Sequence, residues 1–245
     1  AVTTDRAHRR SPSFTEHLRR NRPYLRDTIL GVNDGLVSML LLVAGVVGGG
    51  LSSRNVLLTG IAGAVAGAIS MAAGEYMATK SQDEVFEGEI ALERDHIREH
   101  REAELHELRD LLGEIGLQGE TRGQVVEYFG RDDRSLLHAM TALEFGVVET
   151  ERRKPHVAMY LSGLLFTVGS LPAVLPFVFI ASTRVALIVA AGITVAGLLG
   201  VGAVKTWATR GKPLRAAIEN LLVAGLGGGL AYGVGTMFDR LVGNG

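Results

Sequence analysis

Five stretches of this 245-residue chain are long, apolar and almost free of charge. A helix needs about 20 apolar residues to cross the hydrocarbon core of a bilayer. A soluble protein would have to bury five helices that have almost no polar face, which is rare. The sequence therefore predicts an all-α, polytopic membrane protein with five transmembrane helices. One stretch, residues 28–53, carries a single charged residue, Asp34, and the others carry none: residues 55–74, 157–183, 185–204 and 220–238.

The charged residues are concentrated between the second and third apolar stretches. Residues 80–155 hold 19 of the 26 Asp and Glu residues of the chain. Seven arginines precede the first stretch, whereas the links after the first and third stretches have only Arg54 and Arg184. Because basic residues favour the cytoplasmic side, we expect the N-terminus and residues 80–155 to be cytoplasmic. The predicted organisation is a basic N-terminus (1–26), two transmembrane helices (27–79), a cytoplasmic three-helix domain (80–155) and three transmembrane helices (156–245).

Asp34 is the clearest functional candidate, because a charge inside a transmembrane helix is costly and usually has a function. Asp27 lies two helical turns before it on the same face. The second stretch runs back toward the cytoplasm and carries Met71 and, one turn further, Glu75. The two antiparallel helices can therefore present Asp27, Asp34, Met71 and Glu75 as a ladder of ligands. Carboxylates with a thioether suit Fe²⁺ better than Mg²⁺ or Ca²⁺. Two simpler interpretations are that Met71 only packs and that Asp27 caps a helix.

A second set of ligands is predicted in residues 80–155. If one helix continues to Gly113, acidic and imidazole side chains at steps of three and four form one stripe on it. Further helices are expected at 120–129 and 134–152, the last of which has Met140 and Glu144 four residues apart. The simpler interpretation is a solvated face, which we expect for other acids of the segment such as Glu89. The stripe consists of Glu93, His96, His100, Glu104 and Glu107.

Several classes of function are disfavoured by the composition. The absence of cysteine excludes thiolate metal sites and cysteine nucleophiles, so a metal would need carboxylate, imidazole or thioether ligands. A net charge of −1 gives no reason to expect nucleic acid as a partner. We find no nucleotide-binding signature, and we expect neither a prosthetic group nor an enzymatic activity. Arginine outnumbers lysine, which suggests a GC-rich genome and hence a bacterial inner (plasma) membrane.

Two motifs give the chain a specific resemblance. The first stretch contains Arg26-Asp-Thr-Ile-Leu-Gly-Val-Asn-Asp-Gly-Leu-Val-Ser38, and the second ends with Ser70-Met-Ala-Ala-Gly-Glu-Tyr-Met-Ala-Thr-Lys-Ser-Gln82. In these motifs, and from Tyr24 to Leu241, the chain resembles the vacuolar iron transporter family. The resemblance implies a homodimer that exchanges Fe²⁺ for protons through a path between its subunits.

The resemblance also implies roles for individual residues. Asp34 and Met71 match the membrane-embedded metal ligands, and Asp27 matches an acidic residue near the entrance. His96 stands where the family usually has glutamate, and Thr141 where a second methionine is common. The residues that match ligands of the cytoplasmic domain are Glu93, Glu104, Glu107, Met140 and Glu144.

We therefore expect a transporter that exports cytoplasmic Fe²⁺, and also Mn²⁺, by proton antiport. Co²⁺ and Zn²⁺ suit the same ligands. The expected partners are divalent metal ions, protons, the lipid bilayer and a second copy of the chain. One alternative is a membrane-anchored ferroxidase or metal-storage module, which leaves Asp34 without a role. Another is a metal-sensing module, which would bind metal through residues 80–155 but transport nothing.

Overall fold

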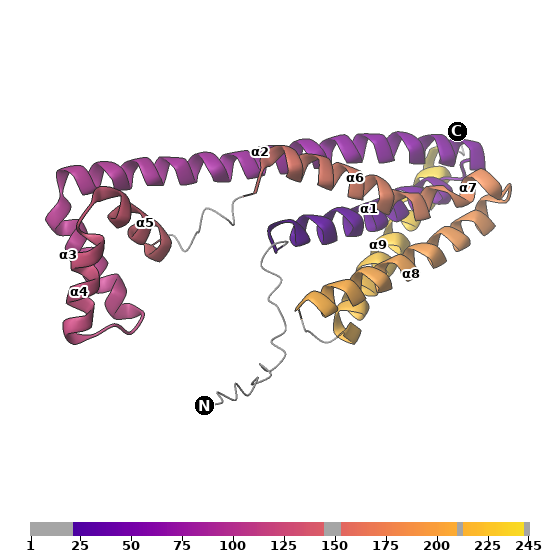
Figure 1. Ribbon diagram of the computed structural model, residues 1–245. Helices are drawn as coiled ribbons and strands as arrows, with labels where there is room; N and C mark the ends of the chain where they lie inside the picture. Colours follow the sequence, from indigo (N-terminus) through magenta and orange to yellow (C-terminus); the bar gives the residue numbers. More distant parts are fainter. Residues whose placement is uncertain (1–21, 145–152, 210–212, 243–245) are drawn as a thin grey trace, which may run out of the picture.

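The computed structural model describes residues 22–144, 153–209 and 213–242, and every regular element in these residues is an α-helix (Figure 1). Five helices are long and apolar enough to cross a membrane. The prediction of an all-α polytopic membrane protein is confirmed. The spanning helices are α1 (Arg22–Gly48), α2 (Ser53–Glu99), α6 (Pro155–Val174), α8 (Thr183–Thr209) and α9 (Pro213–Val242).

Helix α2 is far longer than a membrane crossing requires. Its 47 residues extend about 70 Å, more than twice the thickness of the bilayer core. The helix begins where the Ser52 side chain accepts a hydrogen bond from the backbone N–H of Asn55. Figure 1 shows α2 running from the membrane helices to the small helices at its far end. The second span and the first helix of the charged segment are therefore one continuous element.

The predicted continuous helix up to Gly113 is wrong, because α2 ends at Glu99 and α3 (Arg101–Glu114) begins after a break at His100. His100 has the non-helical backbone angles φ −131° and ψ 37°. Helix α4 (Gly119–Phe129) agrees closely with the prediction.

Helix α5 (Asp133–Glu144) begins near the predicted residue, and residues 145–152 of the predicted helix lie outside the described part of the chain. The small helices α3, α4 and α5, together with the end of α2, enclose an apolar core. That core is formed by Ile97, Leu108, Leu112, Val126, Leu136, Ala139 and Met140.

The third span is shorter than its apolar run. The sequence predicts a span over 157–183, but α6 ends at Val174 and a four-residue helix, α7 (Pro176–Phe179), follows. Proline has no backbone N–H and favours the first turn of a helix, so Pro176 begins a new helix. Apolar composition alone therefore overestimated this span.

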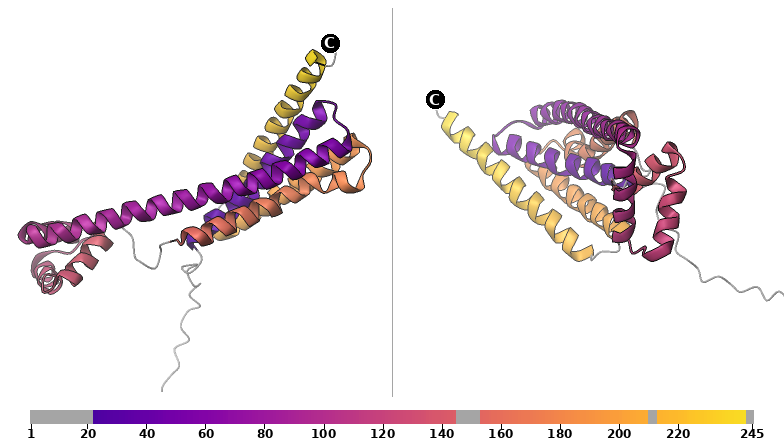
Figure 2. Two further views of the ribbon diagram at one scale, coloured as in Figure 1. Left: turned by 90° about the horizontal axis from the view of Figure 1, so that it is seen from above. Right: turned by 90° about the vertical axis from the view of Figure 1, so that its left-hand side faces the viewer.

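The membrane helices pack around α1 and α6. Helix α6 contacts both α1 and α2, and α9 lies along α1 and α8 on one side of the bundle (Figure 2). Glycine permits the closest approach: a Cβ added to Gly35 of α1 would collide with the Phe166 carbonyl and the backbone of Gly169 in α6. Gly169 approaches the Val32 carbonyl in the same way. The two backbones can lie this close only because both positions lack a side chain.

The start of α1, the small helices and the start of α6 lie toward the same end of the membrane helices, and α9 ends at the opposite end (Figure 1). This is the arrangement expected for an odd number of crossings. Five of the seven N-terminal arginines that favour a cytoplasmic N-terminus lie in residues 1–21, outside the described part of the chain. The orientation therefore stays a prediction.

We predict that Gly35→Ala destabilises the protein, because the new methyl group overlaps the backbone of α6. Overpacking of this kind costs about 1–3 kcal/mol. Thermal unfolding of the purified protein in detergent should show a melting temperature several degrees lower. Gly192→Ala is the matched control, since a Cβ at Gly192 meets no atom of the described chain within 4 Å. Equal melting temperatures for the two variants would contradict this account of the α1–α6 contact.

Candidate metal sites

The first candidate site is a pocket of about 430 Å³ between α1 and α2. The lining includes the carboxylates of Asp34 and Glu75 and the thioethers of Met39 and Met71, together with the hydroxyls of Ser38 and Ser70. The Ser38 hydroxyl donates a hydrogen bond of 2.9 Å to Asp34 Oδ1. This bond orients the carboxylate and leaves its other oxygen available to a ligand. The pocket thus combines hard carboxylate oxygens with a soft thioether.

The structure brings together three of the four residues of the predicted ladder. Asp34, Met71 and Glu75 line the same pocket, whereas Asp27 does not line it. The interpretation of Asp27 as a helix cap is wrong, because α1 already begins at Arg22. Met71 lines the pocket and also packs against the apolar core of the bundle, so its packing role is confirmed without excluding a ligand role.

Asp27 is connected to the pocket through Arg153, a residue that sequence reasoning missed. Asp27 is 1% exposed, and Arg153 Nη1 lies 2.6 Å from its Oδ1 and 2.8 Å from Oε1 of Glu75. The only sequence signal was the run Arg152-Arg153-Lys154 before the third span. Such a run usually indicates nothing more than the basic flank of a transmembrane helix.

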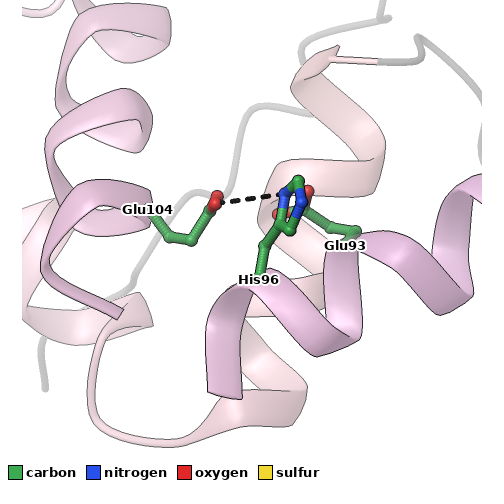
Figure 3. A group of neighbouring side chains, drawn as sticks. All are labelled: Glu93, His96 and Glu104. Carbon is green, nitrogen blue, oxygen red and sulfur yellow. Dashed lines mark ion pairs between the residues drawn. The ribbon is translucent and has the colours of Figure 1, made fainter. Parts of the chain in front are cut away.

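The second candidate site lies where α2 ends and α3 begins (Figure 3). One ligand atom from each of Glu93, His96 and Glu104 lies within 4.8 Å of the others. His96 Nδ1 is 3.6 Å from Glu104 Oε1. Glu93 and His96 are one turn apart on α2, and the break at His100 lets α3 turn so that Glu104 faces them. The stripe predicted on one helix is therefore divided between two helices that face each other.

Two carboxylates of this cluster are buried. Glu93 and Glu104 are each 5% exposed, and one oxygen of each has no hydrogen-bond partner in the described part of the chain. Burial and, to a smaller extent, the charges of Glu104, Glu144 and Glu107 together raise the pKa of Glu93 to about 7. Buried, mutually repelling carboxylates with unused oxygens are well suited to a cation.

Glu107 and Glu144 surround the cluster without joining its closest group. Burial raises the pKa of Glu144, as do the charges of Glu107, Glu104 and Glu89, while His96 lowers it. Glu89 thus adds negative charge near the cluster, although the sequence suggested only a solvated residue. Spacing could not reveal this, because Glu89 and Glu144 are on different helices.

Met140 is fully buried in the apolar core of the small helices. Its role as a ligand stays a prediction. Among the described residues, the other histidines of the segment do not belong to the closest group of ligands. His106 Nδ1 is 3.2 Å from Asp110 on the exposed surface, His138 lines a separate pocket with Arg94 and Arg98, and His100 separates α2 from α3.

Both sites offer ligands of the same chemical class. Carboxylate, imidazole and thioether groups together suit divalent ions of intermediate softness, namely Fe²⁺, Mn²⁺, Co²⁺ and Zn²⁺. Glu75 and Glu93 are 18 residues apart on the continuous helix α2, which corresponds to about 27 Å. One rigid helix therefore carries ligands of both sites.

Comparison with known proteins agrees with this chemistry. The model of the VIT family matches residues 25–236. Vacuolar iron transporter 2 of Oryza sativa subsp. japonica is 32% identical over 86% of the chain and 85% of the relative. Vacuolar iron transporter 1 of Arabidopsis thaliana is 30% identical over 85% of the chain and 83% of the relative. A vacuolar iron transporter of Toxoplasma gondii is 26% identical over 93% of the chain and 78% of the relative.

The raised pKa of Glu93 predicts how metal binding to the cluster depends on pH. A protonated carboxyl group cannot bind a metal, so affinity should fall as the pH falls through about 7. Titration of the purified full-length protein with Co²⁺ should show a loss on the order of tenfold per pH unit below that value. Glu93→Gln should weaken binding and remove this pH dependence.

The same shift predicts an opposite effect on the metal-free protein. Because the folded state holds the Glu93 proton more tightly than the unfolded state, the free energy of unfolding should decrease as the pH rises from 4.5 to about 7. Glu93→Gln should flatten this decrease in a melting experiment. Glu120→Gln, on the exposed first turn of α4, is the control. If Glu93→Gln also behaves like the parent protein, the pKa of Glu93 is not raised in the folded state.

Proposed function

Because the chain belongs to the VIT family, we propose that it transports divalent metal, chiefly Fe²⁺ and also Mn²⁺, across the membrane. The observation that carries this proposal is the pocket between α1 and α2, where Asp34, Met71 and Glu75 meet within apolar helices. A metal-storage protein or sensor would not need ligands at this position. A transporter needs them, because a cation that leaves water must be compensated inside the membrane.

The cluster of Glu93, His96 and Glu104 collects the metal in this proposal. It lies at the end of α2 that projects beyond the membrane helices, on the same side as the start of α1. The positive-inside rule puts this side in the cytoplasm. The cluster captures cytoplasmic metal and raises its concentration near the pocket, so the direction of transport is out of the cytoplasm.

A homodimer would complete the intramembrane site. One subunit supplies two carboxylates, of Asp34 and Glu75, and two thioethers, of Met39 and Met71, whereas carboxylate sites for Mn²⁺ are commonly octahedral. A second copy that faces the same pocket would double the set of ligands. We therefore infer that the transported ion passes between two subunits, each of which contributes Asp34 and Met71.

Protons provide the driving force in this mechanism. A carboxylate must be deprotonated to bind the metal, so protons that reach Asp34 from the far side expel the ion. When the proton leaves to the cytoplasm, Asp34 is ready for the next metal. Metal and protons thus move in opposite directions, and transport needs no nucleotide.

We predict that Asp34→Asn abolishes transport without unfolding the protein, because the amide keeps the size of the side chain but removes its charge. The measurement is metal uptake by sealed proteoliposomes of known orientation, which contain a metal-quenched dye and a pH-sensitive dye. Fe²⁺, Mn²⁺, Co²⁺ and Zn²⁺ are compared under anaerobic conditions. Parent protein should admit metal and release protons, and Asp34→Asn should do neither.

Asp110→Asn is the control, because Asp110 is exposed on α3 and lies away from both sites. It should transport like the parent protein. Full transport by Asp34→Asn would refute the intramembrane site. If no ion moves while the cluster oxidises Fe²⁺ with consumption of oxygen, a membrane-anchored ferroxidase replaces the transporter. Binding with neither transport nor oxidation would indicate a storage or sensing module.

A further inference from the structure

Arg153 connects three helices at the entrance of the intramembrane pocket. It lies two residues before α6, and its side chain is 13% exposed. Nη1 donates to Asp27 Oδ1 of α1 at 2.6 Å and to Glu75 Oε1 of α2 at 2.8 Å. Nη2 donates to the side-chain oxygen of Gln82, also on α2, at 3.1 Å. One nitrogen of the guanidinium group therefore bridges two carboxylates from different helices.

The charge of Arg153 is permanent. Burial alone would lower the pKa of Arg153, but the neighbouring Asp27 and Glu75 carboxylates outweigh this effect and raise it above its ordinary value. A guanidinium group does not lose its proton at any physiological pH. The entrance therefore always contains the charge of Arg153, which can leave the carboxylates only by moving and not by deprotonation.

The two carboxylates are buried enough to require a positive partner. Asp27 is 1% exposed and Glu75 12% exposed. A buried carboxylate without a cation or hydrogen bonds is strongly unfavourable. Glu75 also lines the pocket of Asp34 and Met71. A metal on its way to that pocket therefore meets a carboxylate that already has a cation bound.

We propose that Arg153 is a resident counter-cation that competes with the transported metal for Asp27 and Glu75. This inference rests on the proposed transport function. In the metal-free protein the guanidinium group holds both carboxylates, and an arriving divalent ion displaces it. When the metal has moved on to Asp34 and Met71, the guanidinium group returns to Asp27 and Glu75 and neutralises their charges again.

Competition with a tethered cation also selects for ions of higher charge. A monovalent ion would only replace the single positive charge of Arg153 by another. Because the guanidinium group is attached to the chain, it stays at a high local concentration and competes successfully with such an ion. A divalent ion brings twice the charge to the same two carboxylates, so its attraction to them is larger. Arg153 thereby excludes Na⁺ and K⁺ from the entrance but admits Fe²⁺ and similar ions.

The test measures metal binding by the full-length protein in detergent. The parent for this test is a triple variant whose cluster no longer binds Co²⁺, so that the binding measured is that of the pocket. It carries Glu93→Gln, Glu104→Gln and Glu107→Gln. In this background, Arg153→Gln should bind Co²⁺ at least tenfold more tightly, because the competitor is gone. Its metal-free melting temperature should be lower, and Co²⁺ should raise that temperature by more than in the parent. Na⁺ should compete with Co²⁺ only in Arg153→Gln.

Arg153→Lys is the conservative control. It keeps the positive charge, so its Co²⁺ affinity should stay within threefold of the parent, and Na⁺ should still not compete. If Arg153→Gln does not fold, a double variant, Glu75→Gln/Arg153→Gln, replaces it and is compared with Glu75→Gln. The double variant loses one negative and one positive charge, so it leaves fewer buried carboxylates without a cation. The double variant should bind Co²⁺ more tightly than Glu75→Gln, because the Arg153 guanidinium group no longer competes for Asp27.

The outcomes separate this inference from the proposed function. If Asp34→Asn in the same background eliminates Co²⁺ binding but removal of Arg153 leaves the affinity unchanged or weaker, competition is refuted and Arg153 only connects helices. If Asp34→Asn does not change binding, the intramembrane site itself is wrong and the inference fails with it.

Discussion

Buried negative charge is the constraint on which both candidate sites depend. Carboxylates removed from water need a cation or hydrogen bonds, and the protein provides these differently at its two sites. At the membrane entrance, the permanent charge of Arg153 lies on Asp27 and Glu75. Between α2 and α3, the cationic group beside Glu93 and Glu104 in the described part of the chain is His96, which is charged only when protonated. The cluster is therefore ready for a cation from solution, whereas the entrance already holds an exchangeable one.

Helix α2 links these two electrostatic environments mechanically. It is a single helix of 47 residues that bears Met71 and Glu75 near one site and Glu93 and His96 at the other. A continuous helix sets the distance between them and their relative direction. The close backbone contact of α1 with α6, allowed by glycine, in turn positions Asp34 opposite α2. The geometry of the candidate metal sites thus depends on helix packing that itself contains no charge.

Several predictions from sequence succeeded because they rest on local patterns. The five spans follow from the length of apolar runs, and the meeting of Asp34, Met71 and Glu75 follows from helical periodicity on two antiparallel helices. The failures share a cause: a pattern of apolar or charged residues does not show where a helix breaks. Pro176 shortens the third span, and His100, which has no strong breaking signal, divides the stripe of ligands.

By itself, the sequence determined the class of the protein, the number of spans and the types of ligand, since these depend on composition and on spacing within single helices. Only the tertiary structure decided which side chains meet across a helix break or across a long stretch of sequence. Glu104 reaches Glu93 because the chain turns at His100, and Arg153 reaches Asp27 although 126 residues separate them. Contacts of this kind depend on how helices pack, and packing is determined by side chains that are distant in sequence.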